Sequence, residues 1–149
     1  MSKPAPPEQE ITALVGHKFP TGNYTIAHWE NFLLTDCTGS PALPDGQAHP
    51  VALFHVPFLG TGTTIADLFA LGQAESDLSI LIESYDWEFH QPLREQTEYT
   101  ISGEISEADR RHNASGQLYD RIQFRFDMKC ENQLAASSTI TWHFTRNTL

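Results

Sequence analysis

The sequence predicts a single α+β domain in which a long, curved antiparallel sheet wraps around one central α-helix. The second half of the chain carries four long stretches in which apolar and polar residues alternate, the pattern of strands with one buried face. The first half contains one segment, residues 57–71, that is apolar enough to fill the concave face of such a sheet. With 149 residues, the chain has the usual length of one domain.

The N-terminal part is expected to hold short elements. Residues 1–10 are rich in proline and polar side chains, which predicts a flexible tail and leaves residues 11–149 for the single domain. An apolar patch within 11–19 indicates one or two helical turns or a docking loop. Residues 24–27 are compatible with a first strand. Residues 28–37 carry apolar side chains at helical spacing and precede a glycine stop.

Residues 39–50 separate these elements from the central helix. Their glycines and prolines exclude regular structure, and long loops in compact domains are usually functional or mobile. Pro57 suits the first turn of the helix that follows, because its missing N–H costs nothing there. Gly72 is a conventional helix stop. Gly60 and Gly62 leave a break within the helix as an alternative.

The period of the apolar residues then changes from about 3.6 to 2. The alternation predicts strands over 78–89, 97–105, 122–130 and 134–144, with hairpin connections at 113–116 and 131–132. Strands of this length exceed the usual five or six residues, and long strands coil or bend. The sheet is therefore expected to have one concave face that the central helix covers.

Composition and charge exclude several classes of function. Nineteen acidic residues against nine basic ones give a net charge of −10, which repels polyphosphate backbones and argues against nucleic-acid binding. Cys37 and Cys130 lack the spacing of a zinc site or a disulfide framework. Without an apolar run of about eighteen residues or a signal segment, we expect a cytoplasmic protein without membrane contact. No motif for a metal or bound cofactor is present.

Several segments resemble a known family. Residues 85–94 (YDWEFHQPLR), followed by 99–105 (YTISGEI), resemble the aromatic strand, turn and next strand of MaoC-like and fatty-acid-synthase-type acyl thioester dehydratases (hydratases). The segment from Ile122 to Arg146 is similar to the last two strands of that family, and residues 49–55 (HPVALFH) resemble the approach to its central helix. The likeness covers most of residues 11–146 and implies the hotdog fold.

The resemblance also implies an activity. Such enzymes add or remove water on acyl thioesters carried by coenzyme A or acyl carrier protein, with an aspartate and a histidine about five residues apart as acid and base. A backbone N–H at the helix start stabilises the developing enolate. This chain lacks the family's Asp-x-Asn-Pro-x-His segment. The nearest candidates are Asp36, which precedes the loop, and Asp45 and His49, which lie four residues apart and which we take as the candidate catalytic pair.

Five further residues are candidate substrate-binding residues. His55 is expected to face the substrate, or else to be a core histidine. Gly60, Thr61 and Gly62 would bring backbone donors close to a ligand carbonyl, or else mark a kink in the helix. The guanidinium of Arg94 suits the phosphates of coenzyme A, with solvated surface as its alternative.

Two other interpretations remain open. The chain is alternatively a catalytically silent hotdog subunit or acyl-binding module that pairs with an active partner, which the missing Asp/His segment favours. A thioesterase would need a carboxylate on the central helix, where Asp67 is the sole candidate. Unpaired edge strands predict a homodimer, or a heterodimer with another hotdog subunit, in which the two sheets join.

Overall fold

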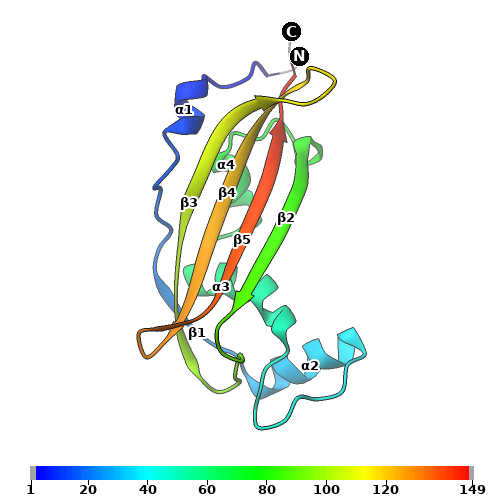
Figure 1. The fold of residues 1–149 in the computed structure, drawn as a ribbon, viewed down its shortest axis with the longest axis vertical. Helices are drawn as coiled ribbons and strands as arrows, with labels where there is room; N and C mark the ends of the chain where they lie inside the picture. Colours follow the sequence, from blue (N-terminus) through cyan, green and yellow to red (C-terminus); the bar gives the residue numbers. More distant parts are fainter. Residues whose placement is uncertain (1–2, 148–149) are drawn as a thin grey trace.

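The computed structural model describes residues 3–147, which form one curved five-stranded antiparallel sheet with helices on its concave face (Figure 1). The strands are β1 (Gly22–Thr25), β2 (Ile80–Phe89), β3 (Glu98–His112), β4 (Leu118–Cys130) and β5 (Gln133–Thr145). Their order in the sheet is β1-β3-β4-β5-β2, so β1 and β2 form its two edges. The four predicted long strands and both hairpins are confirmed.

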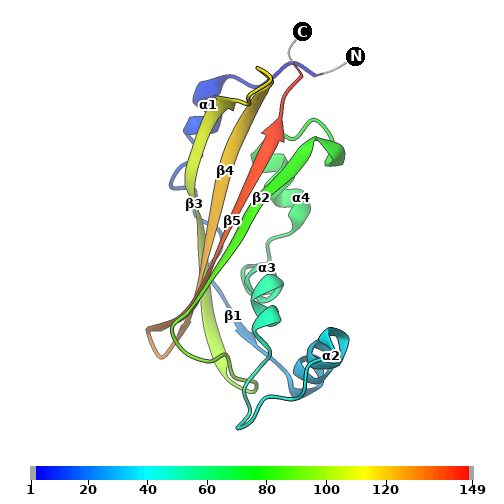
Figure 2. The ribbon, with the colours of Figure 1, turned by 45° about the vertical axis from the view of Figure 1, so that its right-hand side comes forward.

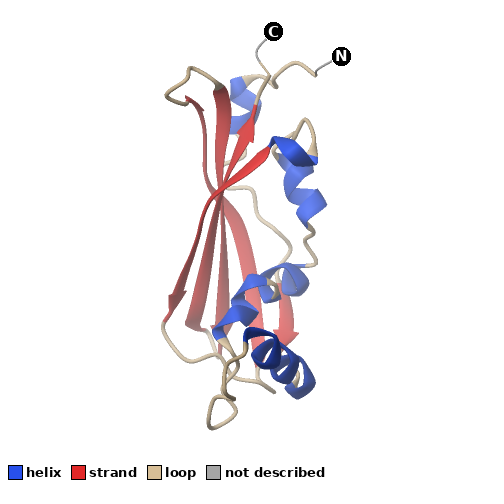
Figure 3. Ribbon diagram, turned by 90° about the vertical axis from the view of Figure 1, so that its right-hand side faces the viewer, coloured by secondary structure: helices blue, strands red, loops and turns tan. Residues whose placement is uncertain are grey.

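The helical segments are short. They are α1 (Glu8–Thr12), α2 (His28–Thr38), the 3₁₀ helix η1 (Pro50–Phe54), α3 (Val56–Thr61), α4 (Ile65–Leu71) and the 3₁₀ turn η2 (Asp77–Ser79). Figures 2 and 3 show α2, α3 and α4 in a row on one side of the sheet, while α1 lies beside the part of β3 that β1 does not pair with. Among the described residues, no helix combines the length and apolar character that a membrane span requires.

The predicted central helix lies on the concave face, but it is two helices rather than one. Gly62 adopts a left-handed conformation with φ of 63° and ends α3. Thr64 and Asp67 then start α4 with reciprocal caps: the Thr64 hydroxyl accepts from Asp67 N at 3.1 Å, and Asp67 Oδ2 accepts from Thr64 N at 2.7 Å. The expectation of a continuous helix over 57–71 is thus corrected, because the chain breaks at Gly62 and restarts with its own cap.

Helix α3 packs on the sheet with backbone against backbone. A Cβ atom on Gly60 would lie 2.4 Å from Cδ1 of Ile101, and one on Gly22 would lie 1.8 Å from the Gly60 carbonyl oxygen. Glycine is therefore required at position 22, whereas a side chain at position 60 would force the Ile101 side chain to move. The alternating strand residues complete the core on this face, among them Ile101, Ile105, Ile122, Phe124, Phe126 and Met128.

Helix α2 is oriented opposite to what its apolar spacing indicates. The side chains of Trp29, Phe32 and Leu33 are 67%, 62% and 51% exposed, whereas Glu30 and Thr35 are buried. The helix therefore turns its apolar stripe outward and a carboxylate inward. This inversion sets the chemistry of the region beside η1.

A buried ionic cluster joins the N-terminal segment, the end of α4, and strands β3, β4 and β5. Asp120 accepts from Arg110 Nε at 2.8 Å and from Arg146 Nε at 2.8 Å. Arg146 also donates to the carbonyl oxygens of Gly72 and Gln73 at 2.6 and 2.7 Å, so each of its three nitrogens has an oxygen partner. Arg110 reaches the Pro6 carbonyl at 2.7 Å, which holds the N-terminal segment in place.

Candidate functional site

The loop that carries Asp45 and His49 is fixed against the β2–β3 connection. Ala48 N donates to Leu93 O at 2.7 Å, and Glu95 N donates to Gly46 O at 3.0 Å. The Arg94 guanidinium donates to the Asp45 carbonyl oxygen at 3.0 Å. Two backbone hydrogen bonds and one side-chain contact therefore hold this loop in a single position, and Arg94 is one of the residues that hold it.

A second restraint comes from Asn31 on α2. Its Oδ1 accepts from His49 N at 2.8 Å, while its Nδ2 donates to Gln47 O at 3.1 Å and to Glu95 Oε2 at 2.9 Å. One amide side chain thus links the helix, the loop and the β2–β3 connection. Asn31 had no signal in the sequence, because its partners lie 16 or more residues away.

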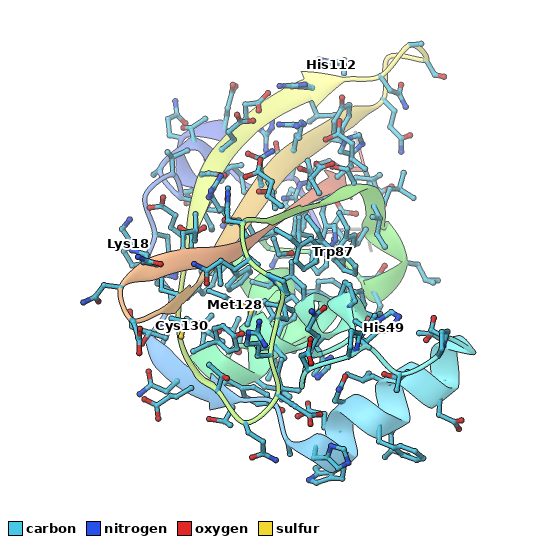
Figure 4. The ribbon with its side chains drawn as sticks, turned by 60° about the horizontal axis from the view of Figure 1, so that its bottom comes forward. Lys18, His49, Trp87, His112, Met128 and Cys130 are labelled. Carbon is cyan, nitrogen blue, oxygen red and sulfur yellow. The ribbon has the colours of Figure 1, made fainter. Side chains whose placement is uncertain are left out.

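The His49 ring is used to start η1. Its Nδ1 accepts from Val51 N at 3.0 Å, which places the proton of the neutral ring on Nε2, 3.4 Å from Thr38 Oγ1. Figure 4 shows His49 on the α2 side of the molecule. Asp45 is exposed with a φ of 58°. Within residues 3–147 its carboxylate makes no hydrogen bond, so none joins the two members of the predicted pair.

A cavity of about 430 Å³ lies between this loop and the end of β2. Its volume falls in the range of ordinary small-molecule sites. Most of its wall is apolar, formed by Leu43, Ala48, Pro50, Phe89, Pro92 and Leu93. Ala48 and Pro50, the two sequence neighbours of His49, therefore both line the cavity. Its apolar wall suits an apolar chain.

Three polar side chains that sequence reasoning did not group meet at the start of α3. Glu30 Oε2 accepts from Tyr24 OH at 2.7 Å and from His55 Nε2 at 2.8 Å, and Glu30 Oε1 accepts from Ala27 N at 3.3 Å. Burial acts to raise the pKa of Glu30, but the hydrogen bonds from His55, Tyr24 and Ala27 outweigh it and lower the pKa below 4.5. Burial, the hydrogen bond to Glu30 and its charge raise the pKa of Tyr24 to about 12.

These contacts define the state of the His55 ring. An ionised Glu30 can only accept, so His55 Nε2 carries the proton and donates it to the carboxylate. The His55 side chain remains 29% exposed, against 10% for Glu30. In the described part of the chain, no protein group hydrogen-bonds His55 Nδ1. The arrangement is a carboxylate that orients an imidazole whose other nitrogen can exchange a proton.

The other predicted binding residues have structural positions. Gly60 faces Ile101 of the sheet. The buried Thr61 hydroxyl donates to Pro57 O at 2.8 Å and lies 2.9 Å from the Thr63 hydroxyl. Gly62 lines a different, mostly apolar groove of about 480 Å³ between α4 and residues 17–20. A substrate-binding role for these three residues stays a prediction.

Two chemical features complete the description of the region. Asp67, the candidate carboxylate for a thioesterase, is an exposed helix cap; hydrogen bonds with Thr64 N and Oγ1 lower its pKa. Among the residues that the structure describes, no three His, Cys, Asp or Glu side chains are grouped as metal ligands would be.

Comparison with known proteins shows similarity in structure but not in sequence. No family profile matches the chain, and no curated protein matches it in sequence. Among solved structures, the ChsH1-ChsH2 complex from Mycobacterium tuberculosis matches with a TM-score of 0.69 and 10% identity, over 95% of this chain and 89% of that one.

Two dehydratases also match. The HadBC (3R-hydroxyacyl-ACP dehydratase) complex from Mycobacterium tuberculosis gives a TM-score of 0.67 at 12% identity, over 89% of this chain and 98% of that chain. A MaoC-like dehydratase from Phytophthora capsici gives 0.63 at 13% identity over 95% of this chain, which spans about half of that protein. The chain therefore has the hotdog fold, as the sequence resemblance implies.

Proposed function

We propose that this protein acts on acyl thioesters as a hydratase or dehydratase, with coenzyme A or acyl carrier protein as the carrier of the acyl group. The observation that carries the proposal is the open, mostly apolar cavity of about 430 Å³ between the hydrogen-bonded loop and the end of β2. An acyl chain matches the apolar wall, and the imidazoles of His49 and His55 lie at the two ends of the adjoining η1 turn. The fold of the two dehydratases supports the same class of substrate.

The role of Asp45 and His49 as the acid/base pair remains a proposal. The geometry gives the pair little support, because Nδ1 of His49 is used as a cap and the Asp45 carboxylate has no partner within the described residues. This observation favours a second candidate function, a catalytically silent subunit that binds acyl groups and pairs with an active partner.

We propose that the chain pairs with a second hotdog subunit, a further copy in the simplest case. Strand β2 is a free sheet edge, and Leu81 and Ile82 on it are 56% and 64% exposed. An edge with exposed apolar side chains is a natural site for a joined sheet. The ChsH1-ChsH2 and HadBC structures are themselves complexes.

The direct test is hydration of crotonyl-CoA, followed by the loss of enoyl absorbance. The wild-type chain should react, and Ala48→Trp, which fills the cavity, should lose at least a factor of ten in kcat/KM. Ala66→Trp on the exposed side of α4 is the matched control. If acyl-CoA raises the melting temperature but no reaction occurs, the silent subunit replaces this proposal. Sedimentation of the same preparation should show a dimer, and a monomer at micromolar concentration would exclude the homodimer.

A further inference from the structure

The imidazole of His55 combines a fixed orientation with a partly exposed ring. Here Nε2 is held at 2.8 Å by a carboxylate that is itself held by Tyr24 and Ala27, while the ring stays 29% exposed. Such a carboxylate fixes the tautomer of the imidazole and stabilises the imidazolium that forms when the ring takes up a proton.

The 3₁₀ helix η1 connects His55 to the cavity, although His55 is not one of the residues that line it. His55 closes η1, whose first residue, Pro50, lines the cavity. Five residues of 3₁₀ helix rise by about 10 Å. Phe54, next to His55, lies with its ring centroid 5.5 Å from that of Tyr85 on β2, so η1 runs along the same strand whose end bounds the cavity. A substrate whose acyl chain lies in the cavity would extend its carbonyl end along η1 toward His55.

We propose that His55 is the catalytic proton-transfer residue for the acyl thioester and that Glu30 is its positioning residue, held in turn by Tyr24. The inference rests on the proposed function and assigns the proton transfer to residues other than Asp45 and His49. Glu30 touches the substrate only through His55. Two consecutive residues of α2 therefore hold parts of the site: Glu30 orients the imidazole of His55, and Asn31 binds the loop.

The reaction balances with water alone. As the oxygen of a water molecule bonds to the β-carbon of the enoyl thioester, one O–H bond breaks and His55 Nδ1 receives the proton. The electron pair of the Cα–Cβ double bond moves onto the thioester as an enolate. The imidazolium, paired with the Glu30 carboxylate, then returns its proton from Nδ1 to the α-carbon. Dehydration is the reverse sequence.

The test compares variants of the full chain with crotonyl-CoA as substrate and butyryl-CoA as unreactive ligand. His55→Gln keeps a donor for Glu30 and should lower kcat about 10²- to 10⁴-fold, the usual contribution of general acid–base catalysis. His112→Gln, at the exposed end of β3 in Figure 4, is the matched control and should keep the wild-type rate. Glu30→Gln should lower kcat less than His55→Gln, with Glu98→Gln as its control.

A spectroscopic readout separates catalysis from folding. The ¹⁵N spectrum of wild-type His55 should show the Nε2–H tautomer, Glu30→Gln should give a mixture, and butyryl-CoA should shift the ring resonances. Hydration activity that survives in His55→Gln overturns this inference and leaves the proposed function standing. The same holds if hydration activity is lost in Asp45→Asn but retained in His55→Gln. Absence of any acyl-CoA binding or reaction overturns both.

Discussion

Two of the protein's clusters of charged side chains differ in how completely they are paired. In the first, Asp120 and Arg146 are 0% and 1% exposed, and every nitrogen of Arg146 donates to an oxygen. In the second, Glu30 is buried but His55 remains partly exposed with one nitrogen free of protein partners among the described residues. Complete pairing in the interior serves stability, whereas pairing on one side of a half-exposed ring leaves a group that can react.

The largest effect is expected at Asp120. Asp120→Ala leaves the guanidinium of Arg146 buried without its carboxylate, and breaking one partner of a buried pair costs about 3–5 kcal/mol. Urea denaturation measures this loss of unfolding free energy. Asp109→Ala is the matched control on β3, because its partner Arg111 lies at the surface, and it should cost about 0–1 kcal/mol. Equal losses in the two variants would show that the Asp120 cluster is not a structural anchor.

A smaller effect is expected at Glu30. Glu30→Gln removes the charge that accepts from His55 and Tyr24, and should cost about 1–3 kcal/mol at pH 7. Because folding lowers the pKa of Glu30 below 4.5, its stabilisation is fully present above that value and is lost as the pH falls through the folded pKa. The stability gap between wild type and Glu30→Gln should therefore narrow at acid pH. A gap that stays constant down to pH 3 would contradict the assignment.

The smallest effect concerns the titration of Tyr24. Its pKa of about 12 should fall toward the ordinary 10.0 in Glu30→Gln, while burial retains part of the shift. A phenol with a raised pKa contributes stability below pH 10 that is lost as the pH rises through about 12. The ¹³Cζ resonances report the titration, and Tyr24→Phe identifies the signal. A wild-type Tyr24 that titrates near 10 would show that the phenol does not bond Glu30.

The sheet was predictable because β3 and β4 each have one buried face. In β4, Ile122, Phe124, Phe126 and Met128 are all buried, and their alternation with polar residues is visible without a structure. Gly60 and Gly62 indicated a break in the central helix as an alternative. The Thr64-x-x-Asp67 pattern, a capping box, carries the signal for where α4 begins.

The sequence indicated the loop of the candidate site but not the contacts of its side chains. The loop that carries Asp45 and His49 does border a cavity, but the partner of His55 is 25 residues away on a helix whose apolar spacing indicated the opposite orientation. Long-range polar contacts produce no periodic pattern in the sequence. Helical geometry is satisfied whichever side of α2 faces inward. Tertiary packing alone turned Glu30 inward.

The break after Gly62 makes the two halves of the helical layer mechanically separate. Helix α4 buries a single residue, Leu68, and begins at its own cap. Its far end is fixed as well, because the carbonyl oxygens of Gly72 and Gln73 accept from the buried guanidinium of Arg146. The two halves of the layer are therefore attached independently, α3 to β1 and β3, and α4 through Gly72 and Gln73 to the guanidinium of Arg146.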